Sequence, residues 1–148
     1  MTALKRIIKY VNTTAEFGVW YSKDTNGVLA GYSDADWAGN ADDRKSTSGG
    51  CFYVGNNLVS WMSKKQYSIS LSTAEAEYIA ASICCTQLLW MQKLLHDYGI
   101  SQEHLTIYCD NTSAINLFKN PKADLFTKPL DSKRFEFLRQ NIGVISMD

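Results

Sequence analysis

Apolar and polar residues follow two different spacings along this chain, and each change of spacing marks a new element. From Leu4 to Val11 the apolar residues recur at helical spacing, which predicts a short amphipathic helix. From Val28 to Trp37 the spacing becomes the alternation of a strand, and Asp34 and Asp36 fall on the same face. The first strand therefore ends with two carboxylates that point the same way.

A β-hairpin is predicted next. A polar loop from Gly39 to Ser48 precedes two apolar runs, Cys51 to Val54 and Leu58 to Met62, and a Gly-Asn-Asn turn joins them. We therefore expect the first three strands to pair antiparallel in chain order.

The longest helical pattern begins after Ser72 and continues to about Tyr98, before Gly99. Glu75 follows Ser72 at the spacing of a capping box, which explains Glu75 without any chemistry. Glu77 shares its helix face with apolar residues, so we expect it to face the sheet. A carboxylate in that position needs a partner, and Glu77 is the leading functional candidate.

Leu105 to Asp110 reads as a fourth strand, and Thr112 to Lys119 as a short helix that ends at Asn120-Pro121. Because a long helix separates strands three and four, strand four should run parallel to strand 1. A final helix is predicted from Ser132 to Gln140. The pattern predicts an α/β fold with a mixed sheet: strands 1-2-3 antiparallel, strand 4 parallel to strand 1, and flanking helices.

The composition is that of one folded domain. The chain has 148 residues, of which 45% are apolar and 20% charged, and its formal net charge is zero. A nucleic-acid partner must therefore be bound by local basic patches. Arg44 with Lys45, and Lys64 with Lys65, are such patches, although each alone is typical of a solvated surface.

Cysteine usage favours a reducing compartment. The four cysteines include no CxxC pair and no zinc-ligand spacing with the two histidines. No apolar run approaches the roughly 20 residues of a membrane span, and the N-terminus lacks the features of a secretory signal. We expect an intracellular protein, cytoplasmic or nuclear, with no membrane partner.

Four carboxylates are candidates for chemistry: Asp34, Glu77, Asp110 and Asp124. Periodicity does not separate Asp34 from Asp36, and Asp-Asn before a helix is also common turn and N-cap chemistry. Asp124 alone would be a solvated loop residue. If strands one and four are neighbours, the first three carboxylates converge, and such a cluster requires a hard divalent cation, Mg²⁺ or Mn²⁺.

The motifs around these carboxylates closely resemble those of the ribonuclease H domain of copia-type retrotransposon Pol polyproteins. The matching segments, in the family's order, are GYSDADWAGNADDRKSTSGGCFYVG, SWMSKKQ, STAEAEYIAA, YCDNTSAI and ADLFTKPL. The resemblance implies a ribonuclease H-like fold and hydrolysis of the RNA strand of an RNA–DNA hybrid. It also implies two metal ions, bound by Asp34, Glu77, Asp110 and Asp124.

The resemblance further implies a division of the chain. Residues 1–24 look like a remnant of the connection segment after a reverse transcriptase, so the reverse transcriptase region of a parent polyprotein is an implied partner. Residues 25–120 would be the ribonuclease H-like core, and residues 121–148 a shortened C-terminal segment with the last carboxylate.

The chain departs from the family between residues 119 and 124. The family has a few dozen residues there, including a histidine and the fifth strand, whereas Asn120-Pro121-Lys122 joins the two motifs directly. We therefore expect the fifth strand to be missing, strand four to be an exposed edge, the second metal to bind weakly and cleavage to be slow.

Two alternatives to a nuclease are open. A catalytically inactive nucleic-acid-binding or interaction module would keep the sheet and the basic loops. A strand-transfer enzyme of related fold is disfavoured because Glu77 precedes Asp110 in the chain.

Overall fold

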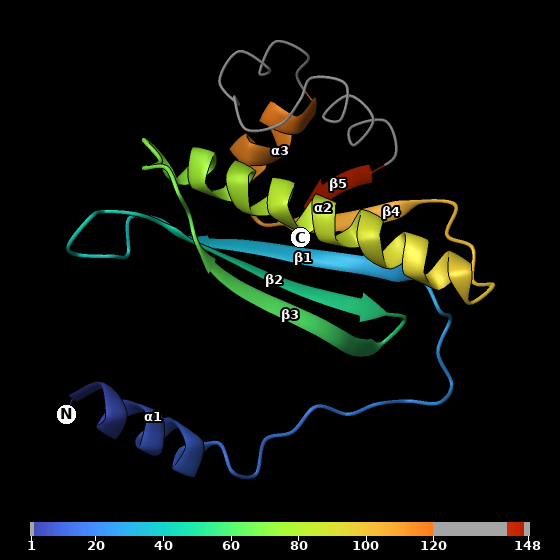
Figure 1. Cartoon of the computed structure of the whole chain (residues 1–148), viewed down its shortest axis with the longest axis horizontal. Helices are drawn as coiled ribbons and strands as arrows, with labels where there is room; N and C mark the ends of the chain where they lie inside the picture. The colour runs from blue at the N-terminus through green and yellow to red at the C-terminus, as the bar shows by residue number, and fades with distance from the viewer. Residues whose placement is uncertain (1, 120–141, 147–148) are drawn as a thin grey trace.

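The computed structural model of the chain describes residues 2–119 and 142–146, which form a five-stranded sheet in the order β3-β2-β1-β4-β5 with helices beside it (Figure 1). The elements in chain order are α1 (Thr2–Thr13), β1 (Leu29–Asp36), β2 (Thr47–Val54), β3 (Asn57–Lys65), α2 (Thr73–Asp97), β4 (Leu105–Cys109), α3 (Thr112–Lys119) and β5 (Ile142–Ser146). The predicted α/β fold class is confirmed.

The sheet is mixed in the way that the sequence predicts. β1 pairs antiparallel with β2, and β2 with β3, whereas β4 runs parallel to β1. The long crossover helix α2 makes the parallel step between β3 and β4. β1 is the central strand, so its end lies between the ends of β2 and β4.

The prediction that the fifth strand is missing was wrong. β5 pairs parallel with β4 from Leu105 opposite Ile142 to Cys109 opposite Ser146, so β4 is not an edge strand. The segment Ile142–Ser146 is rich in β-branched residues, which favour strands, and the unpaired side of β4 offers it hydrogen-bonding groups. The sequence-based reading expected this strand only before Asp124. The predicted helix from Ser132 to Gln140 lies outside the described residues.

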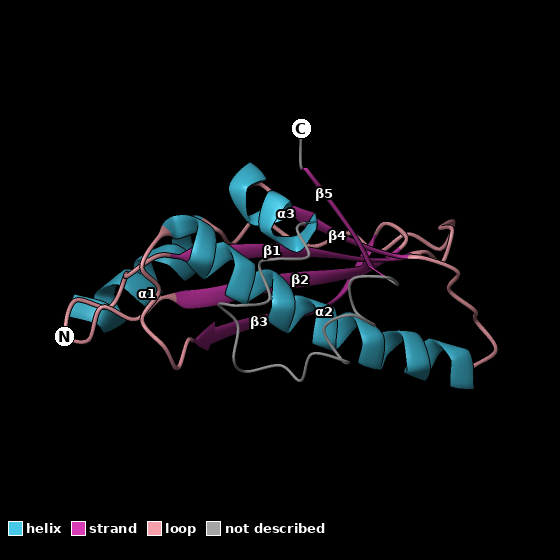
Figure 2. Cartoon of the chain, turned by 90° about the horizontal axis from the view of Figure 1, so that it is seen from above, coloured by secondary structure: helices cyan, strands magenta, loops and turns pink. Residues whose placement is uncertain are grey.

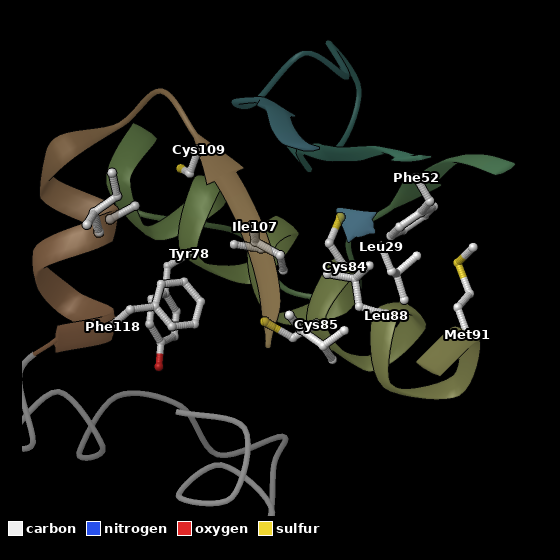
Figure 3. Packing of buried hydrophobic residues seen from close by; sticks show 14 residues of the cluster. Leu29, Phe52, Tyr78, Cys84, Cys85, Leu88, Met91, Ile107, Cys109 and Phe118 are labelled. Atoms are coloured by element: carbon white, nitrogen blue, oxygen red, sulfur yellow. The ribbon is translucent and has the colours of Figure 1, made fainter. Parts of the chain in front are cut away.

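Helix α2 lies very close to the sheet because two glycines of the strands face its side chains. A Cβ on Gly50 of β2 would come within 2.6 Å of Cys84 Sγ, and one on Gly31 of β1 within 3.1 Å of Leu88 Cδ1. Figure 3 shows Cys84 and Leu88 of α2 beside Leu29 of β1 in the core. The two glycines thus set the height of α2 above β1 and β2.

Both ends of α2 are fixed as the sequence predicts. The Ser72 side chain accepts a hydrogen bond from the Glu75 backbone N–H at 3.1 Å, and Glu75 Oε2 accepts one from Leu71 N–H at 2.7 Å. Gly99, with a φ of 78°, takes the left-handed conformation at the C-terminal end. These caps fix which residues of α2 face the sheet.

α3 extends the same helical layer. The rings of Tyr78 on α2 and Phe118 on α3 lie 4.4 Å apart between centroids (Figure 3). Seen from above, α2 runs across the strands with α3 beside it (Figure 2). This layer leaves the opposite face of the sheet without a helix packed on it among the described residues.

α1 lies apart from this core. It has no buried residue, and its aliphatic residues Leu4, Ile7, Ile8 and Val11 are each about 60% exposed. Figure 1 shows α1 on the other side of the sheet from α2 and α3. The proposed domain boundaries after residues 24 and 120 stay a prediction. No helix in residues 2–119 or 142–146 combines the length and apolar character needed to cross a bilayer.

The close approach of α2 predicts that Gly50→Ala destabilises the protein. The new methyl group would be forced against Cys84 Sγ, and such overpacking costs about 1–3 kcal/mol. Gly49→Ala is the matched control, since its Cβ would meet only ordinary contacts at 3.6 Å or more. Both changes restrict the unfolded chain equally. Urea unfolding measures the difference, and equal stability of the two variants would contradict the packing argument.

Candidate metal centre

Two parallel strands bring two carboxylates to one end of the sheet. β1 and β4 are in register at Tyr32 and Tyr108, so Asp34 and Asp110, each two residues further on, lie at the same edge. Asp110 follows the last residue of β4 directly. The convergence expected from the sequence is therefore present for these two residues.

Glu77 of α2 faces the same place, as its helix position predicts. Only 7% of its surface is exposed, and its Oε1 accepts a hydrogen bond from Ala35 N–H, beside Asp34, at 3.0 Å. Its Oε2 is buried and has no hydrogen-bond partner among the described residues. Glu75, on the exposed side, caps the helix instead.

The electrostatics at Glu77 are those of a buried carboxylate among like charges. The pKa of Glu77 is raised from its ordinary 4.5 to about 7, mainly by burial and in smaller part by the charges of Asp110 and Asp34. The hydrogen bond from Ala35 acts in the opposite direction. No charge among the described residues compensates the ionised form of Glu77, and a cation would do so.

Asp34 and Asp36 have different surroundings although they share a strand face. The Asp36 carboxylate lies where a Cβ on residue 39 would be, which is possible only because that residue is Gly39. Asp36 therefore turns toward the loop after β1. Asp34, and not Asp36, is among the charges that act on the pKa of Glu77. This geometry favours Asp34 as the member of the centre.

Asn111, and not Asp110, is the N-cap residue of α3. Asn111 Oδ1 accepts a hydrogen bond from Ala114 N–H at 3.0 Å, so Asn111 caps α3. Asp110 is exposed, and one of its carboxylate oxygens lies within 4.8 Å of a Glu77 oxygen and of Cys109 Sγ. Asp34 is not in that closest group.

Cys109 is the member of the group that sequence reasoning missed. It was counted only as one of four cysteines without a zinc spacing, yet its alternation with Leu105 and Ile107 already placed it on one side of the strand. That side faces α2, where Cys109 is fully buried and where Glu77 points. Burial raises the pKa of the Cys109 thiol, so the thiol stays protonated near neutral pH.

The residues present fit a hard divalent cation. Glu77 and Asp110 offer carboxylate oxygens close enough to share an ion, and the buried Oε2 of Glu77, which no described residue hydrogen-bonds, is available as a ligand atom. Asp34 lies near enough to act on Glu77 through its charge. Asp124, the fourth predicted ligand, lies outside the described residues.

A buried glutamine, Gln66, fixes the backbone next to Glu77, and sequence reasoning also missed it. Gln66 Nε2 donates to the Ala76 carbonyl, just before Glu77, and to Ser48 Oγ, both at 3.0 Å. Gln66 Oε1 accepts from Ser70 Oγ at 2.9 Å. The Gln66 side chain thus connects the start of α2 to β2 and to the loop before the helix. Its position in the family segment SWMSKKQ was the feature of the sequence that could have identified it.

The four predicted nucleic-acid-binding residues lie in two places. Arg44 and Lys45 belong to the turn after β1, where Arg44 has a left-handed φ of 54°. Lys64 and Lys65 end β3, where the Lys64 ammonium lies 5.5 Å from the Tyr67 ring centroid. Lys65 forms an ion pair with Asp43 of that turn, N to O 2.7 Å, which brings the two basic pairs together.

Comparison with known proteins gives consistent relatives. The chain is 37% identical over 140 residues to the retrovirus-related Pol polyprotein from transposon TNT 1-94 of Nicotiana tabacum, covering 95% of the chain and 10% of the polyprotein. It is 42% identical over 120 residues to the corresponding polyprotein from transposon RE2 of Arabidopsis thaliana, covering 80% and 8%. The chain thus spans about a tenth of the length of these relatives. No protein-family profile matches it.

Solved structures show the same fold. The crystal structure of LC11-RNase H1 in complex with an RNA/DNA hybrid superposes with a TM-score of 0.51, covering 80% of this chain and 84% of that one. The identity is 10%, so the likeness concerns the fold alone. The sequence relatives and the fold together confirm the family resemblance.

The raised pKa of Glu77 predicts a pH-dependent stability in metal-free protein. Folded Glu77 keeps a proton that the unfolded chain releases above its ordinary pKa of 4.5, so the free energy of unfolding should fall as the pH rises from about 4.5 to about 7. Glu77→Gln should remove about 2 kcal/mol of this fall.

Urea unfolding with a chelator at pH 5 and pH 8 measures it. Glu75→Gln, on the same helix but on the exposed side, should retain the wild-type difference. An undiminished pH difference in the Glu77 variant would contradict the assignment.

Proposed function

Because the chain belongs to the ribonuclease H-like domains of retrovirus-related Pol polyproteins from transposons, we propose that it is a metal-dependent endonuclease for the RNA strand of RNA–DNA hybrids. The observation that carries the proposal is Glu77, which is buried beside Asp110 with one carboxylate oxygen that has no hydrogen-bond partner among residues 2–119 and 142–146. A purely structural carboxylate at this position would have both of its oxygens hydrogen-bonded, whereas only Oε1 of Glu77 accepts a hydrogen bond from a described residue.

Asp34, Glu77 and Asp110 would hold the divalent ions, and Asp124 would be the fourth ligand. Two bound Mg²⁺ or Mn²⁺ ions would supply an activated water and stabilisation of the leaving 3′ oxygen. The chain itself holds Glu77 in place through Ala35 N–H, and Gln66 fixes the backbone before it. The side chains are thereby oriented before substrate binds.

The substrate would be bound mainly through its phosphates. Arg44, Lys45, Lys64 and Lys65 lie close together through the ion pair between Lys65 and Asp43, and form a basic surface on a chain of zero net charge. The Asp43 carboxylate compensates part of the charge of Lys65, so we assign the larger share of phosphate binding to the other three. Contacts to the 2′-hydroxyls would distinguish RNA from DNA.

We also propose the reverse transcriptase region of a parent polyprotein as a partner and an intracellular location, cytoplasmic or nuclear. The exposed apolar residues of α1 offer a surface to that region. The relatives are Pol polyproteins about ten times longer than this chain, which supports the same partner.

The proposal predicts metal-dependent stabilisation. Mg²⁺ or Mn²⁺ at 100 times the dissociation constant should stabilise the fold by roughly 2.7 kcal/mol, seen as a rise in Tm. Asp34→Asn should raise the stability of the metal-free protein and remove the response, since it deletes a like charge and a ligand. Glu77→Gln should abolish metal binding in a calorimetric titration, whereas Glu75→Gln should bind normally.

The proposal also predicts cleavage of a labelled RNA–DNA hybrid, with products from the RNA strand only. We expect cleavage to be slow, because the short connection after Asn120 must position Asp124, and an error of about 1 Å costs roughly 100-fold in rate. Asp34→Asn should remove the activity and Glu75→Gln should retain it. Hybrid binding without metal-dependent cleavage would instead assign the chain as an inactive nucleic-acid-binding module.

A further inference from the structure

Cys109 places a sulfur atom inside a centre otherwise built from oxygen. Its Sγ, one oxygen of Glu77 and one oxygen of Asp110 all lie within 4.8 Å of one another. Ligands of one tetrahedral Zn²⁺ ion, at about 2.3 Å for sulfur and 2.0–2.2 Å for oxygen, lie about 3.5 Å apart. The three atoms would therefore close in on the ion by about 1 Å, and the exposed Asp110 side chain is free to rotate inward.

The sulfur changes which ions the centre prefers. Mg²⁺ and Mn²⁺ take oxygen ligands and make little use of a thiol. Zn²⁺ binds both carboxylate and thiolate, and it stands above Mn²⁺ in general affinity for a site of given donors. Replacing the thiol by a hydroxyl would therefore affect the two kinds of ion very differently.

A second observation points to an ion at this place. Glu77 is more than nine-tenths buried, and its Oε2 has no hydrogen-bond partner among the described residues. Among the described residues, the charges that act on Glu77 belong to Asp34 and Asp110, and both are negative. The Cys109 side chain thus lies beside the Glu77 carboxylate, whose Oε2 accepts no hydrogen bond from a described residue.

We propose that Cys109, Glu77 and Asp110 form a mixed sulfur and oxygen site for Zn²⁺ that overlaps the proposed Mg²⁺ centre, so that Zn²⁺ excludes Mg²⁺ and inhibits the nuclease. The inhibitory role rests on the proposed function. On binding, Cys109 releases its proton to solvent and becomes a thiolate ligand. Asp34, outside the closest group, is not a ligand of this ion.

The test uses Cd²⁺ as a spectroscopic probe for Zn²⁺, because a cadmium–thiolate bond has a charge-transfer absorption in the ultraviolet. The half-buried Cys51 is first replaced by serine to remove binding at an accessible thiol. The Cys51→Ser protein should bind one equivalent of Cd²⁺ with this absorption, and Zn²⁺ should displace it.

Adding Cys109→Ser should abolish the absorption and weaken Cd²⁺ binding at least roughly tenfold. The matched control is Cys84→Ser, another fully buried cysteine, whose Sγ lies 3.7 Å from the Gly49 carbonyl and outside the metal group. This control should keep the absorption. If the cadmium–thiolate absorption persisted in the Cys109→Ser protein, or if both variants lost it equally, the proposal would be overturned.

Two further measurements keep the result decisive. Asp110→Asn changes an exposed residue, so it is suitable if Cys109→Ser does not fold, and it should weaken Cd²⁺ binding at least roughly tenfold while the absorption remains at saturation. Unchanged affinity would refute the site. Mn²⁺ should still raise the Tm of the Cys109→Ser protein. If Mn²⁺ raised the Tm of none of these proteins, the proposed Mg²⁺ centre would be rejected. The cadmium absorption would still test the sulfur site independently.

Discussion

The close contact between α2 and the sheet is the constraint on which the rest of the structure depends. Gly31 and Gly50 leave no Cβ where Leu88 and Cys84 pack, so the helix axis lies low over β1 and β2. At that height Glu77 reaches the backbone N–H of Ala35. A larger residue at either glycine would lift the helix and separate the glutamate from the strand end where Asp34 and Asp110 lie.

The same contact makes the centre electrostatically costly. Glu77 is removed from water, and its nearest charges repel its ionised form. The described part of the fold holds this arrangement through hydrogen bonds from uncharged donors, those of Ala35 to Glu77 and of Gln66 to the helix start, and includes no ion pair at these carboxylates. A group kept in an unfavourable environment by its neighbours is typical of a site that binds a ligand.

Local spacing predicted the first four strands, the caps of α2 and the orientation of Glu77, and the long crossover helix predicted that β4 runs parallel to β1, whereas the fifth strand was not predicted. Local spacing did not separate Asp34 from Asp36, since both share a strand face and only the turn at Gly39 distinguishes them. The cap on α3 depends on which of two adjacent polar residues rotates toward the helix. Cys109 and Gln66 were missed because their roles come from contacts between elements far apart in the chain.

The parallel pairing of β4 and β5 also has a kinetic consequence. β1, β2 and β3 follow one another along the chain, whereas β4 pairs with β1 only after α2, and β5 pairs with β4 only after α3 and a further segment. Both parallel pairings therefore join residues far apart in the chain, and such contacts form slowly, since the intervening chain loses conformational freedom before any pairing compensates it. During synthesis the hydrogen-bonding groups on the β5 side of β4 thus stay unpaired until β5 has been made. In that interval, another newly made chain with a similar strand could occupy it, which makes β4 the expected starting point for misassembly.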